Sequence, residues 1–300
     1  MNNYFELKIN INPEIEDIVS DIIFTNFDCE GIVQEEETYK DLEMTSTTKG
    51  TLRVFLTSYP VNLEEILKTE RELLKSRGFT DNELGSWEIT LDEKENQDWS
   101  KKWKEKWTVT HVTDKIAVVP SWLEYHPQKD EITITLDPGC AFGTGTHQTT
   151  QLCMKALEKY LKKGDSVADI GTGSGILAIL AKKLGAKEVY GCDNDETVIE
   201  VCKENAVINN VSDIVFELNT ADKLSKQYDF VCANILHFVL AEIMGDLKNI
   251  LKTGGLMSLS GILDEKKDMV LDAIKRENLE IIDTLSQDQW ISFVVKKTDN

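Results

Sequence analysis

The chain has 300 residues, of which 41% are hydrophobic and 29% are charged, a composition typical of a folded globular protein. Its 33 basic residues are outnumbered by 53 acidic ones, and the resulting net charge of −20 argues against free nucleic acid as a partner. The N-terminus has no basic segment followed by an apolar one, and no apolar run is long enough to span a membrane. We therefore expect a cytoplasmic protein that does not enter a membrane.

The cysteines and histidines give no sign of a metal site or a disulfide framework. None of the six cysteines forms a Cys-x-x-Cys pair, and most of them lie in apolar contexts. The four histidines lack the spacing of metal ligands. We therefore expect reduced thiols and no metal.

The first 95 residues predict a small α+β domain. Apolar residues at helical spacing indicate two helices, one opened by Pro13 and one over Asn62–Arg77. Strands are expected at Tyr4–Ile11, Gly31–Glu37, Thr51–Ser58 and Trp87–Leu91. The resulting order, βαββαβ, is typical of a ferredoxin-like domain.

This small domain carries much of the negative charge. Residues 1–95 hold 22 acidic residues against 9 basic ones, whereas residues 96–300 hold 31 against 24. Such a surface would steer a basic partner toward the domain, although acidic residues can also serve only to keep a protein in solution. Because no catalytic constellation occurs here, we interpret the domain as a binding module rather than a structural appendage.

A charged segment, residues 96–110, is expected to link the small domain to a larger one. Within it Trp99, Trp103 and Trp107 recur every four residues, which would place their rings on one face of a helix. Two roles stay open for this stripe: an aromatic clamp beside an active site, or packing between the domains.

The larger domain, residues 111–300, is expected to open with a β-hairpin of Ile116–Trp122 and Ile132–Leu136. The loop DPGCAFGTGTHQTT, residues 137–150, then precedes an amphipathic helix over Leu152–Leu161. Its threonines Thr146, Thr149 or Thr150 could cap that helix. Alternatively, the loop covers a ligand and offers hydroxyl and backbone donors to a carboxylate.

The stretch SVADIGTGSGILAILAKKLGAKEVYGCDND, residues 166–195, indicates a β–loop–α–β unit that binds a nucleoside. Gly171 and Gly173 belong to a turn that lets a ligand approach the backbone, and the following helix directs N–H groups at it. Asp193, at the end of the second strand, can accept both hydroxyls of a ribose. Asp169 would repel a pyrophosphate but suits a cationic amino acid. S-adenosylmethionine is therefore favoured over NAD, and a glycine turn without a ligand is the bland alternative.

The remaining chain continues the α/β alternation and ends with a hairpin. Helices are expected at Glu196–Asn209, Phe238–Leu251 and Glu265–Glu277, a turn at Thr253–Gly255, and strands at Val215–Leu218, Tyr228–Ala233, Leu256–Ile262, Leu279–Ser286 and Trp290–Lys296. This order predicts a mostly parallel sheet with an antiparallel last strand. Ligands bind at the carboxyl ends of such strands. Asp169, Asp193 and Asn234 all fall at those ends.

Asn234 is the candidate catalytic residue. Its amide oxygen can accept a hydrogen bond from an attacking amine, whose lone pair must be free before it can take a methyl group. A lysine side chain, with a pKa near 10.4, or an N-terminal amine, near 7.7–8.0, must first lose a proton. The alternative without a catalytic role is that Asn234 is simply a turn residue at the end of a strand.

Several motifs occur together and in order from about Asp98 to the end, and with them the chain resembles the bacterial ribosomal protein L-eleven methyltransferase family. They are the tryptophan-lysine linker, VPSW (Val119–Trp122), DPGCAFGTGTHQTT, DIGTGSGILAI, the acid at Asp193, CANIL (Cys232–Leu236) and LSGIL (Leu259–Leu263). The resemblance implies a Rossmann-like class I methyltransferase domain with a mostly parallel seven-stranded sheet. It also implies that the N-terminal domain captures the ribosomal protein, and that lysine side chains and the N-terminal amine are methylated.

The resemblance also implies site residues and partners. Carried over by motif, Thr150, Gly171, Asp193 and Asn234 bind S-adenosylmethionine, and Asn234 also lies near the amine. Phe142, Gly143 and His147 lie in a covering loop, while Gln148 and Cys140 depart from the family pattern there. Together with Asp169 and Gly173 of the glycine turn, Phe142 and Gly143 complete the predicted cofactor site. We expect a monomer whose partner is ribosomal protein L-eleven.

Other functions stay open from the sequence. The chain could methylate another protein, although the release-factor methyltransferases show Asn-Pro-Pro-Tyr where this sequence has Asn234-Ile235-Leu236-His237. It could also be a non-catalytic ribosome-assembly factor that retains S-adenosylmethionine as a structural ligand. Methyl transfer from labelled cofactor would separate these two.

Overall fold

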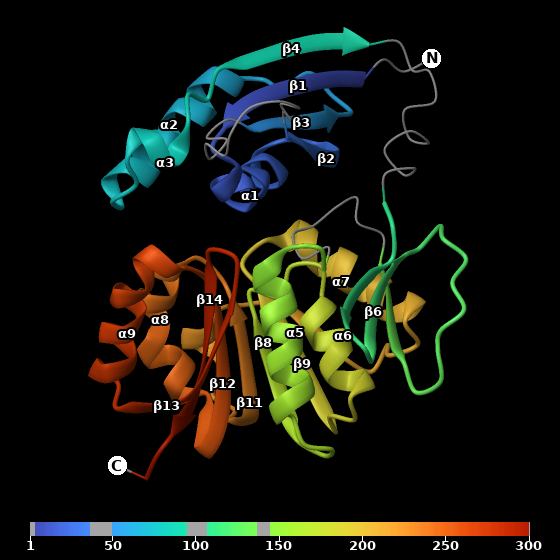
Figure 1. The fold of residues 1–300 in the computed structure, drawn as a ribbon, viewed down its shortest axis with the longest axis vertical. Helices are drawn as coiled ribbons and strands as arrows, with labels where there is room; N and C mark the ends of the chain where they lie inside the picture. The colour runs from blue at the N-terminus through green and yellow to red at the C-terminus, as the bar shows by residue number, and fades with distance from the viewer. Residues whose placement is uncertain (1–3, 37–49, 95–106, 137–144, 300) are drawn as a thin grey trace, which may run out of the picture. The chain divides into compact units, whose positions relative to one another are not determined.

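The computed structural model describes residues 4–36, 50–94, 107–136 and 145–299, and all structural statements concern these residues. The chain divides into two compact units, with a break between Trp107 and Thr108. Figure 1 labels most of the helices and strands of both units. Most of the predicted linker, residues 96–110, lies outside the described residues, so the predicted domain boundaries stay a prediction.

The first unit is a four-stranded antiparallel sheet with helices in the βαββαβ order. Its elements are β1 (Tyr4–Ile11), a 3-10 turn η1 (Pro13–Ile15), α1 (Glu16–Asn26), β2 (Cys29–Glu36), β3 (Gly50–Leu56), α2 (Leu63–Ser76), α3 (Asp81–Leu84) and β4 (Ile89–Lys94). The strands lie in the order β2-β3-β1-β4, each antiparallel to its neighbour. This topology confirms the predicted ferredoxin-like domain.

Alternation along the two central strands builds the core of this unit. Leu7 and Ile9 of β1 pair with Val54 and Leu52 of β3, and all four side chains are fully buried. Because successive strand residues point to opposite faces, one face of the sheet is apolar and is covered by the helices.

The second unit contains a seven-stranded sheet in the order β10-β9-β8-β11-β12-β14-β13. Its strands are β8 (Ser166–Ile170), β9 (Glu188–Asp193), β10 (Val215–Leu218), β11 (Tyr228–Asn234), β12 (Leu251–Leu263), β13 (Leu279–Gln287) and β14 (Trp290–Lys297). The pairs from β10 to β12 are parallel, whereas β14 is antiparallel to both β12 and β13. The predicted class I methyltransferase sheet, with its closing hairpin, is confirmed.

Helices cover both faces of this sheet (Figure 1). They are α5 (Gln148–Tyr160), α6 (Ile176–Lys183), α7 (Glu196–Ile208), α8 (His237–Asn249) and α9 (Lys267–Arg276), with short 3-10 turns η2 (Ala221–Lys223) and η3 (Asp264–Lys266). One apolar cluster joins the sheet to α5, α6 and α7, and a second joins it to α8 and α9. Side chains of β8 alternate between them, since Val167 belongs to the first and Ala168 to the second. Among the described helices, none is both long enough and apolar enough to cross a bilayer.

The predicted hairpin at the start of the second unit is wrong. A separate three-stranded sheet contains β5 (Thr110–Thr113), β6 (Ile116–Pro120) and β7 (Ile132–Leu136) in that order. The hairpin is formed by β5 and β6, whereas β6 and β7 are parallel. The eleven residues between them, 121–131, are long enough to carry the chain back along the strand. The Ile132 amide then bonds the Lys115 carbonyl at 2.7 Å, which starts the parallel register.

Two further boundaries differ from the prediction. Residues Thr253–Gly255, expected as a turn, lie inside β12, whose pairing with β11 shifts between Tyr228 and Phe230. Gly254 takes a φ of +77° in this bulge, a conformation that glycine adopts without strain. Helix α5 begins at Gln148, four residues before the expected start.

Candidate active site

The ends of three adjacent strands bring the predicted polar side chains together. Asp169 lies near the end of β8, Asp193 ends β9 and Asn234 ends β11. The three strands are neighbours in the order β9-β8-β11 and run parallel. Their carboxyl ends therefore share one edge of the sheet, the usual position of ligands in this architecture.

The glycine turn after β8 requires glycine for steric reasons. Gly171, Gly173 and Gly175 have φ of +70°, +53° and +81°. A Cβ on Gly171 would lie 2.5 Å from the Ile235 side chain, which is closer than real Cβ contacts. The Gly171 amide donates to the Cys192 carbonyl at 2.9 Å, so the turn is fastened to β9.

Helix α7 holds the same turn through two side chains that sequence reasoning missed. The Cys202 thiol donates to the Gly173 carbonyl at 2.8 Å, and the Asn205 amide donates to the Ser174 carbonyl at 2.9 Å. Both are buried, and they lie three residues apart on one face of α7. Asn205 shares the buried face of α7 with Ile199, Cys202 and Ala206, and an asparagine on such a face indicates a buried hydrogen-bond partner without identifying it.

The same helix face also fastens β7. Asn209, just beyond α7, accepts from the Thr135 amide at 2.9 Å and donates to the Thr135 carbonyl at 2.6 Å. The edge of β7 is therefore paired with a side chain instead of a strand. Helix α7 thus connects the glycine turn with the strand that precedes the predicted covering loop.

Asp169 is fully buried, and its two oxygens differ. One oxygen, Oδ2, accepts from the Thr172 hydroxyl at 2.8 Å and the Ala178 amide at 3.2 Å. The other, Oδ1, has no partner among the described residues. Burial, together with the nearby charge of Asp193, raises the pKa of Asp169 to about 7, and the bond from Thr172 opposes this rise. A cation beside Oδ1 would stabilise the ionised form.

Asp193 is arranged to accept further hydrogen bonds. Its Oδ2 accepts from the Gly173 amide at 3.0 Å, and its Oδ1 accepts from the Asp195 amide at 3.2 Å. Burial raises the pKa of Asp193, and these backbone bonds oppose the rise. Each carboxylate oxygen can accept more than one hydrogen bond, so both remain able to bind the hydroxyls of a ribose.

Asn234 meets Thr150, which lies 84 residues earlier in the chain. The Asn234 amide nitrogen donates to the fully buried Thr150 hydroxyl at 3.2 Å. Its oxygen, Oδ1, is buried and has no partner among the described residues. The two predicted residues are therefore in contact, and this contact leaves an acceptor in place at the end of β11.

A close approach of two strands supports the end of β11. The Ile235 amide donates to the Ser260 carbonyl at 3.2 Å. The next residue, Gly261, has a φ of +85°, and a Cβ there would lie 2.3 Å from the Ile235 carbonyl oxygen. A side chain at this position would push Ile235, and with it Asn234, out of place.

His147 caps helix α5, so the alternative that Thr146, Thr149 or Thr150 caps it is wrong. The Thr149 amide donates to the His147 ring nitrogen Nδ1 at 3.3 Å. The ring also packs edge-on against Trp290, with 4.9 Å between the ring centroids. Gln148, one of the two departures from the family pattern, donates to Asp288 at 3.2 Å in the turn between β13 and β14. Thr149 and Thr150 are buried within the first turn of α5.

Phe142, Gly143 and Cys140 lie outside the described residues, as do Trp99 and Trp103. Their predicted roles are therefore untested. Within the described ranges, no three His, Cys, Asp or Glu side chains are grouped to hold a metal ion.

The donor set at the strand ends fits S-adenosylmethionine better than a phosphorylated cofactor. Two carboxylates lie close to the glycine turn, and no described lysine or arginine pairs with either of them. A pyrophosphate would be repelled there. A ligand with a ribose and a cationic amino acid would satisfy Asp193 and the unpaired oxygen of Asp169.

Known proteins are similar to this chain in both sequence and fold. A family model described as "Ribosomal protein L11 methyltransferase (PrmA)" matches residues 3–298. The ribosomal protein L11 methyltransferase of Caldicellulosiruptor saccharolyticus is 35% identical over 303 residues, covering 98% of this chain and 99% of the relative. That of Bacillus licheniformis is 40% identical over 243 residues, covering 79% of this chain and 78% of the relative.

A solved structure agrees with these relatives. The ribosomal protein L11 methylase from Lactobacillus delbrueckii subsp. bulgaricus is 35% identical, with a TM-score of 0.62. The match covers 64% of this chain and 100% of that chain. Since the family model spans nearly the entire sequence and the strand ends carry the expected polar residues, this chain belongs to the ribosomal protein L11 methyltransferase family.

Proposed function

We propose that this protein transfers methyl groups from S-adenosylmethionine to amino groups of ribosomal protein L11, namely lysine side chains and the N-terminal amine. The observation that carries the proposal is the unpaired Asn234 Oδ1 at the sheet edge that also holds Asp169 and Asp193. An amine bound to that oxygen would lie beside the cofactor site. The assembly-factor alternative has no need for such an acceptor.

The described residues supply binding and orientation. Asp193 binds the ribose, Asp169 faces the cationic amino acid portion, and Gly171 and Gly173 let the ligand approach the backbone. When bound, S-adenosylmethionine supplies an electrophilic methyl group on its sulfonium. Phe142 and Gly143 complete this site in our proposal, on the family motif alone.

Asn234 orients the amine. Its Oδ1 accepts an N–H bond from the incoming nitrogen, and Thr150 fixes the amide by accepting from its Nδ2. Once the amine has lost its proton, the bond directs the nitrogen lone pair toward the methyl group, and positioning is the main requirement. We assign no general base, and solvent takes the proton in this scheme.

The small unit captures the protein substrate in this proposal. Residues 1–95 have 22 acidic residues against 9 basic ones, which suits a basic ribosomal protein. We retain the division into a capture domain (1–95), a linker (96–110) and a catalytic domain (111–300). We also propose that the enzyme acts as a monomer in the cytoplasm, where its substrate is made; light scattering of the purified chain at 34.0 kDa would check the monomer.

A methylation assay tests the function. Purified ribosomal proteins are incubated with the enzyme and labelled S-adenosylmethionine, and the acceptor is identified by mass spectrometry. We expect label on amines of L11, and we expect Asn234→Ala to lower kcat by about 10²-fold because the amine loses its positioning bond. Label on a different protein would overturn the substrate assignment. Absence of label with cofactor binding intact would overturn the methyl-transfer proposal.

A further inference from the structure

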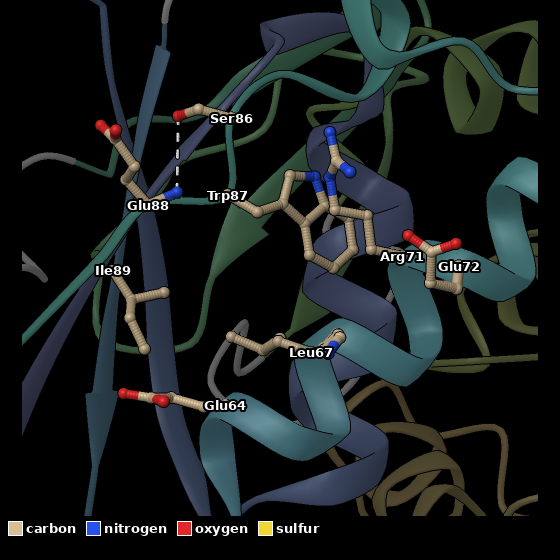
Figure 2. A pocket seen from close by; sticks show the side chains of 9 residues that line it. Glu64, Leu67, Arg71, Glu72, Ser86, Trp87, Glu88 and Ile89 are labelled. Atoms are coloured by element: carbon tan, nitrogen blue, oxygen red, sulfur yellow. Dashed lines mark hydrogen bonds between the residues drawn. The ribbon is translucent and has the colours of Figure 1, made fainter.

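The small unit contains a pocket of about 450 Å³ on the side of helix α2. One wall is α2 itself, and the other is the segment that leads into β4 (Figure 2). The lining residues are Glu64, Leu67, Lys68, Arg71, Glu72, Ser86, Trp87, Glu88 and Ile89. None of them belongs to the active site described above.

The floor of the pocket is apolar and held rigidly. Leu67 and Trp87 are 4% and 8% exposed. Trp87 has a φ of +55°, which is rare for a bulky side chain, and its backbone amide donates to the Asn10 carbonyl at 2.8 Å. Its indole nitrogen donates to the Leu84 carbonyl at 2.8 Å. The ring is therefore fixed in a strained backbone conformation, and such strain commonly accompanies a binding role.

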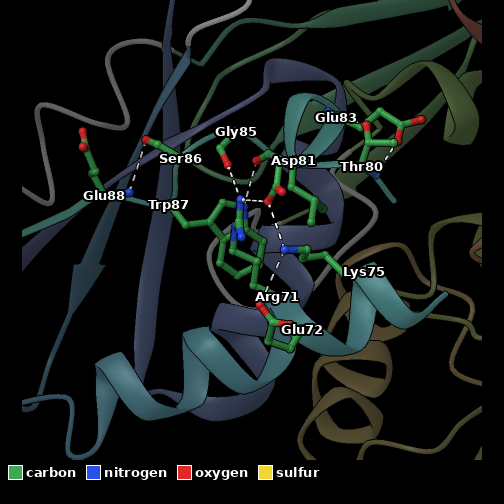
Figure 3. Close-up of polar contacts among 11 residues, drawn as sticks. Arg71, Glu72, Lys75, Thr80, Asp81, Glu83, Gly85, Ser86, Trp87 and Glu88 are labelled. Atoms are coloured by element: carbon green, nitrogen blue, oxygen red, sulfur yellow. Dashed lines mark hydrogen bonds and ion pairs between the residues drawn. The ribbon is translucent and has the colours of Figure 1, made fainter. Parts of the chain in front are cut away.

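Arg71 supports this floor, and its Nη2 is already paired, whereas its Nε is buried without a hydrogen-bond partner among the described residues. Its guanidinium donates to the Asp81 carboxylate at 2.7 Å and to the Gly85 carbonyl at 2.9 Å (Figure 3). Lys75 also lies 3.3 Å from Asp81. Arg71 thus ties the segment before Trp87 to α2, and Asp81 neutralises part of its charge.

The rim of the pocket keeps unpaired carboxylates. Glu64 and Glu88 are exposed, and neither makes an ion pair with any residue in the described part of the chain. Figure 2 shows the Glu64 side chain extending from α2 toward Ile89. Glu72 is 3.8 Å from Lys75, so that contact is loose. Asp81 and Lys75 pair with Arg71 and Glu72, so the cation left to oppose Glu64 and Glu88 among the lining residues is Lys68, and the rim is slightly negative.

We propose that this pocket binds a lysine or arginine side chain of the basic protein substrate. The aliphatic stem of such a side chain would lie against Leu67 and the Trp87 ring, and its cationic head would reach the rim, at either Glu64 or Glu88. The rigid ring limits the entropy lost on binding. This inference rests on the proposed function, because it names the contact by which the small unit holds its substrate.

The test compares two double variants of the full-length enzyme. Glu64→Gln with Glu88→Gln removes the two rim charges, whereas Glu65→Gln with Glu70→Gln removes two charges from α2 that do not line the pocket. Binding of L11 is measured by calorimetry, and KM for L11, kcat and the Kd for S-adenosylmethionine are measured in parallel. We expect the first pair to weaken L11 binding and raise KM by about tenfold, which is 1.4 kcal/mol. Neither kcat nor the cofactor Kd should change.

Three other outcomes have distinct meanings. An equal loss of L11 affinity in both double variants would mean that only the overall charge matters. This result would overturn the proposal that the pocket binds the substrate. Failure of the wild-type enzyme to bind L11 would also overturn it. Binding of L11 with the expected difference between the pairs, but without methyl transfer, would support the pocket and overturn the proposed function alone.

Discussion

Asp169 is a buried acid with one oxygen satisfied by the fold and the other left open. The Thr172 hydroxyl and the Ala178 amide donate hydrogen bonds to Oδ2, whereas Oδ1 has no donor among the described residues. Such an arrangement costs stability in the empty protein, because a buried carboxylate without full pairing is penalised by desolvation. A cationic ligand bound beside Oδ1 would offset this loss of stability by supplying the missing hydrogen-bond partner.

This cost makes stability depend on pH. The folded pKa of about 7 lies above the ordinary value near 3.9, so the folded protein holds a proton that the unfolded chain releases. The contribution of Asp169 is therefore fully present below about pH 4 and is lost as the pH rises through 7. Asp169→Asn should gain up to about 4 kcal/mol relative to wild type over this range. Urea unfolding at several pH values measures the difference, and parallel profiles would contradict the raised pKa.

Asp193→Ala should weaken binding of S-adenosylmethionine by roughly 1.5–3 kcal/mol, because two charge-assisted bonds to the ribose are lost. The Gly173 amide also loses its acceptor, so the turn itself is less well held. Asp195→Ala is the matched control, since this residue caps α7 through Thr197 and is not assigned to the ribose. Calorimetry should show a loss only for the first variant. Equal affinities for both would refute the ribose assignment.

The positions of Asp169, Asp193 and Asn234 could be predicted because each follows from the end of a parallel strand. Contacts between side chains were predicted less successfully than these positions. No feature of the neighbouring sequence shows that Cys202 and Asn205 contact the glycine turn, because that contact depends on how α7 packs against the sheet. The capping role of His147 was missed because threonine is the commoner cap and three threonines lie close by.

At the scale of elements, the site depends on how closely β11 and β12 approach at their ends. Gly261 of β12 lies against the Ile235 carbonyl, directly after Asn234. The end of β11, with the Asn234 amide, is thus held by a backbone contact that admits no side chain. Position 261 accordingly controls the geometry of a residue on another strand.

A pair of glycine variants separates this contact from ordinary backbone strain. Gly254 and Gly261 both have positive φ, but only at Gly261 would a Cβ meet neighbouring atoms. Gly254→Ala should cost about 1–2 kcal/mol of stability from the left-handed conformation and leave kcat unchanged. Gly261→Ala should cost a further ~1–3 kcal/mol and lower kcat as well. Thermal unfolding and steady-state kinetics measure both, and a normal kcat in the second variant would contradict the proposed support of Asn234.

Strand direction is where the element predictions failed. Apolar alternation located β6 and β7 correctly, but alternation is the same in parallel and antiparallel strands. The connection of residues 121–131 permits either direction, and hydrogen bonding at Lys115 and Ile132 decides it. In contrast, β–α–β units leave little choice of direction, so the mostly parallel main sheet with its antiparallel closing strand could be predicted.

At the scale of the whole molecule, charge is distributed unevenly between the two units. The first 95 residues carry 13 of the 20 excess negative charges. A basic substrate should therefore be attracted mainly to the small unit. This attraction acts over long distances, so dissolved salt should screen it.

Ionic strength should consequently change KM for L11 more than kcat or the Kd for S-adenosylmethionine. Raising salt from about 50 to 300 mM shortens the Debye length from above 10 Å to below 8 Å, so KM for L11 should rise several-fold. The value of kcat and the Kd for S-adenosylmethionine should change little, because Asp169 and Thr150 at the strand ends are buried and salt screens buried groups much less. Steady-state kinetics over a salt series measures this, and a KM independent of salt would exclude long-range attraction.

The position of β14 also sets the order in which the molecule can assemble during translation. Residues Trp290–Lys297 form an interior strand, bonded to β12 on one side and β13 on the other. The small unit needs no residue beyond Lys94 for its sheet, so it can fold while later codons are still being read. The catalytic sheet must wait for its second-to-edge strand to leave the ribosome. A nascent chain can therefore have a folded small unit before the sheet of the larger unit is complete.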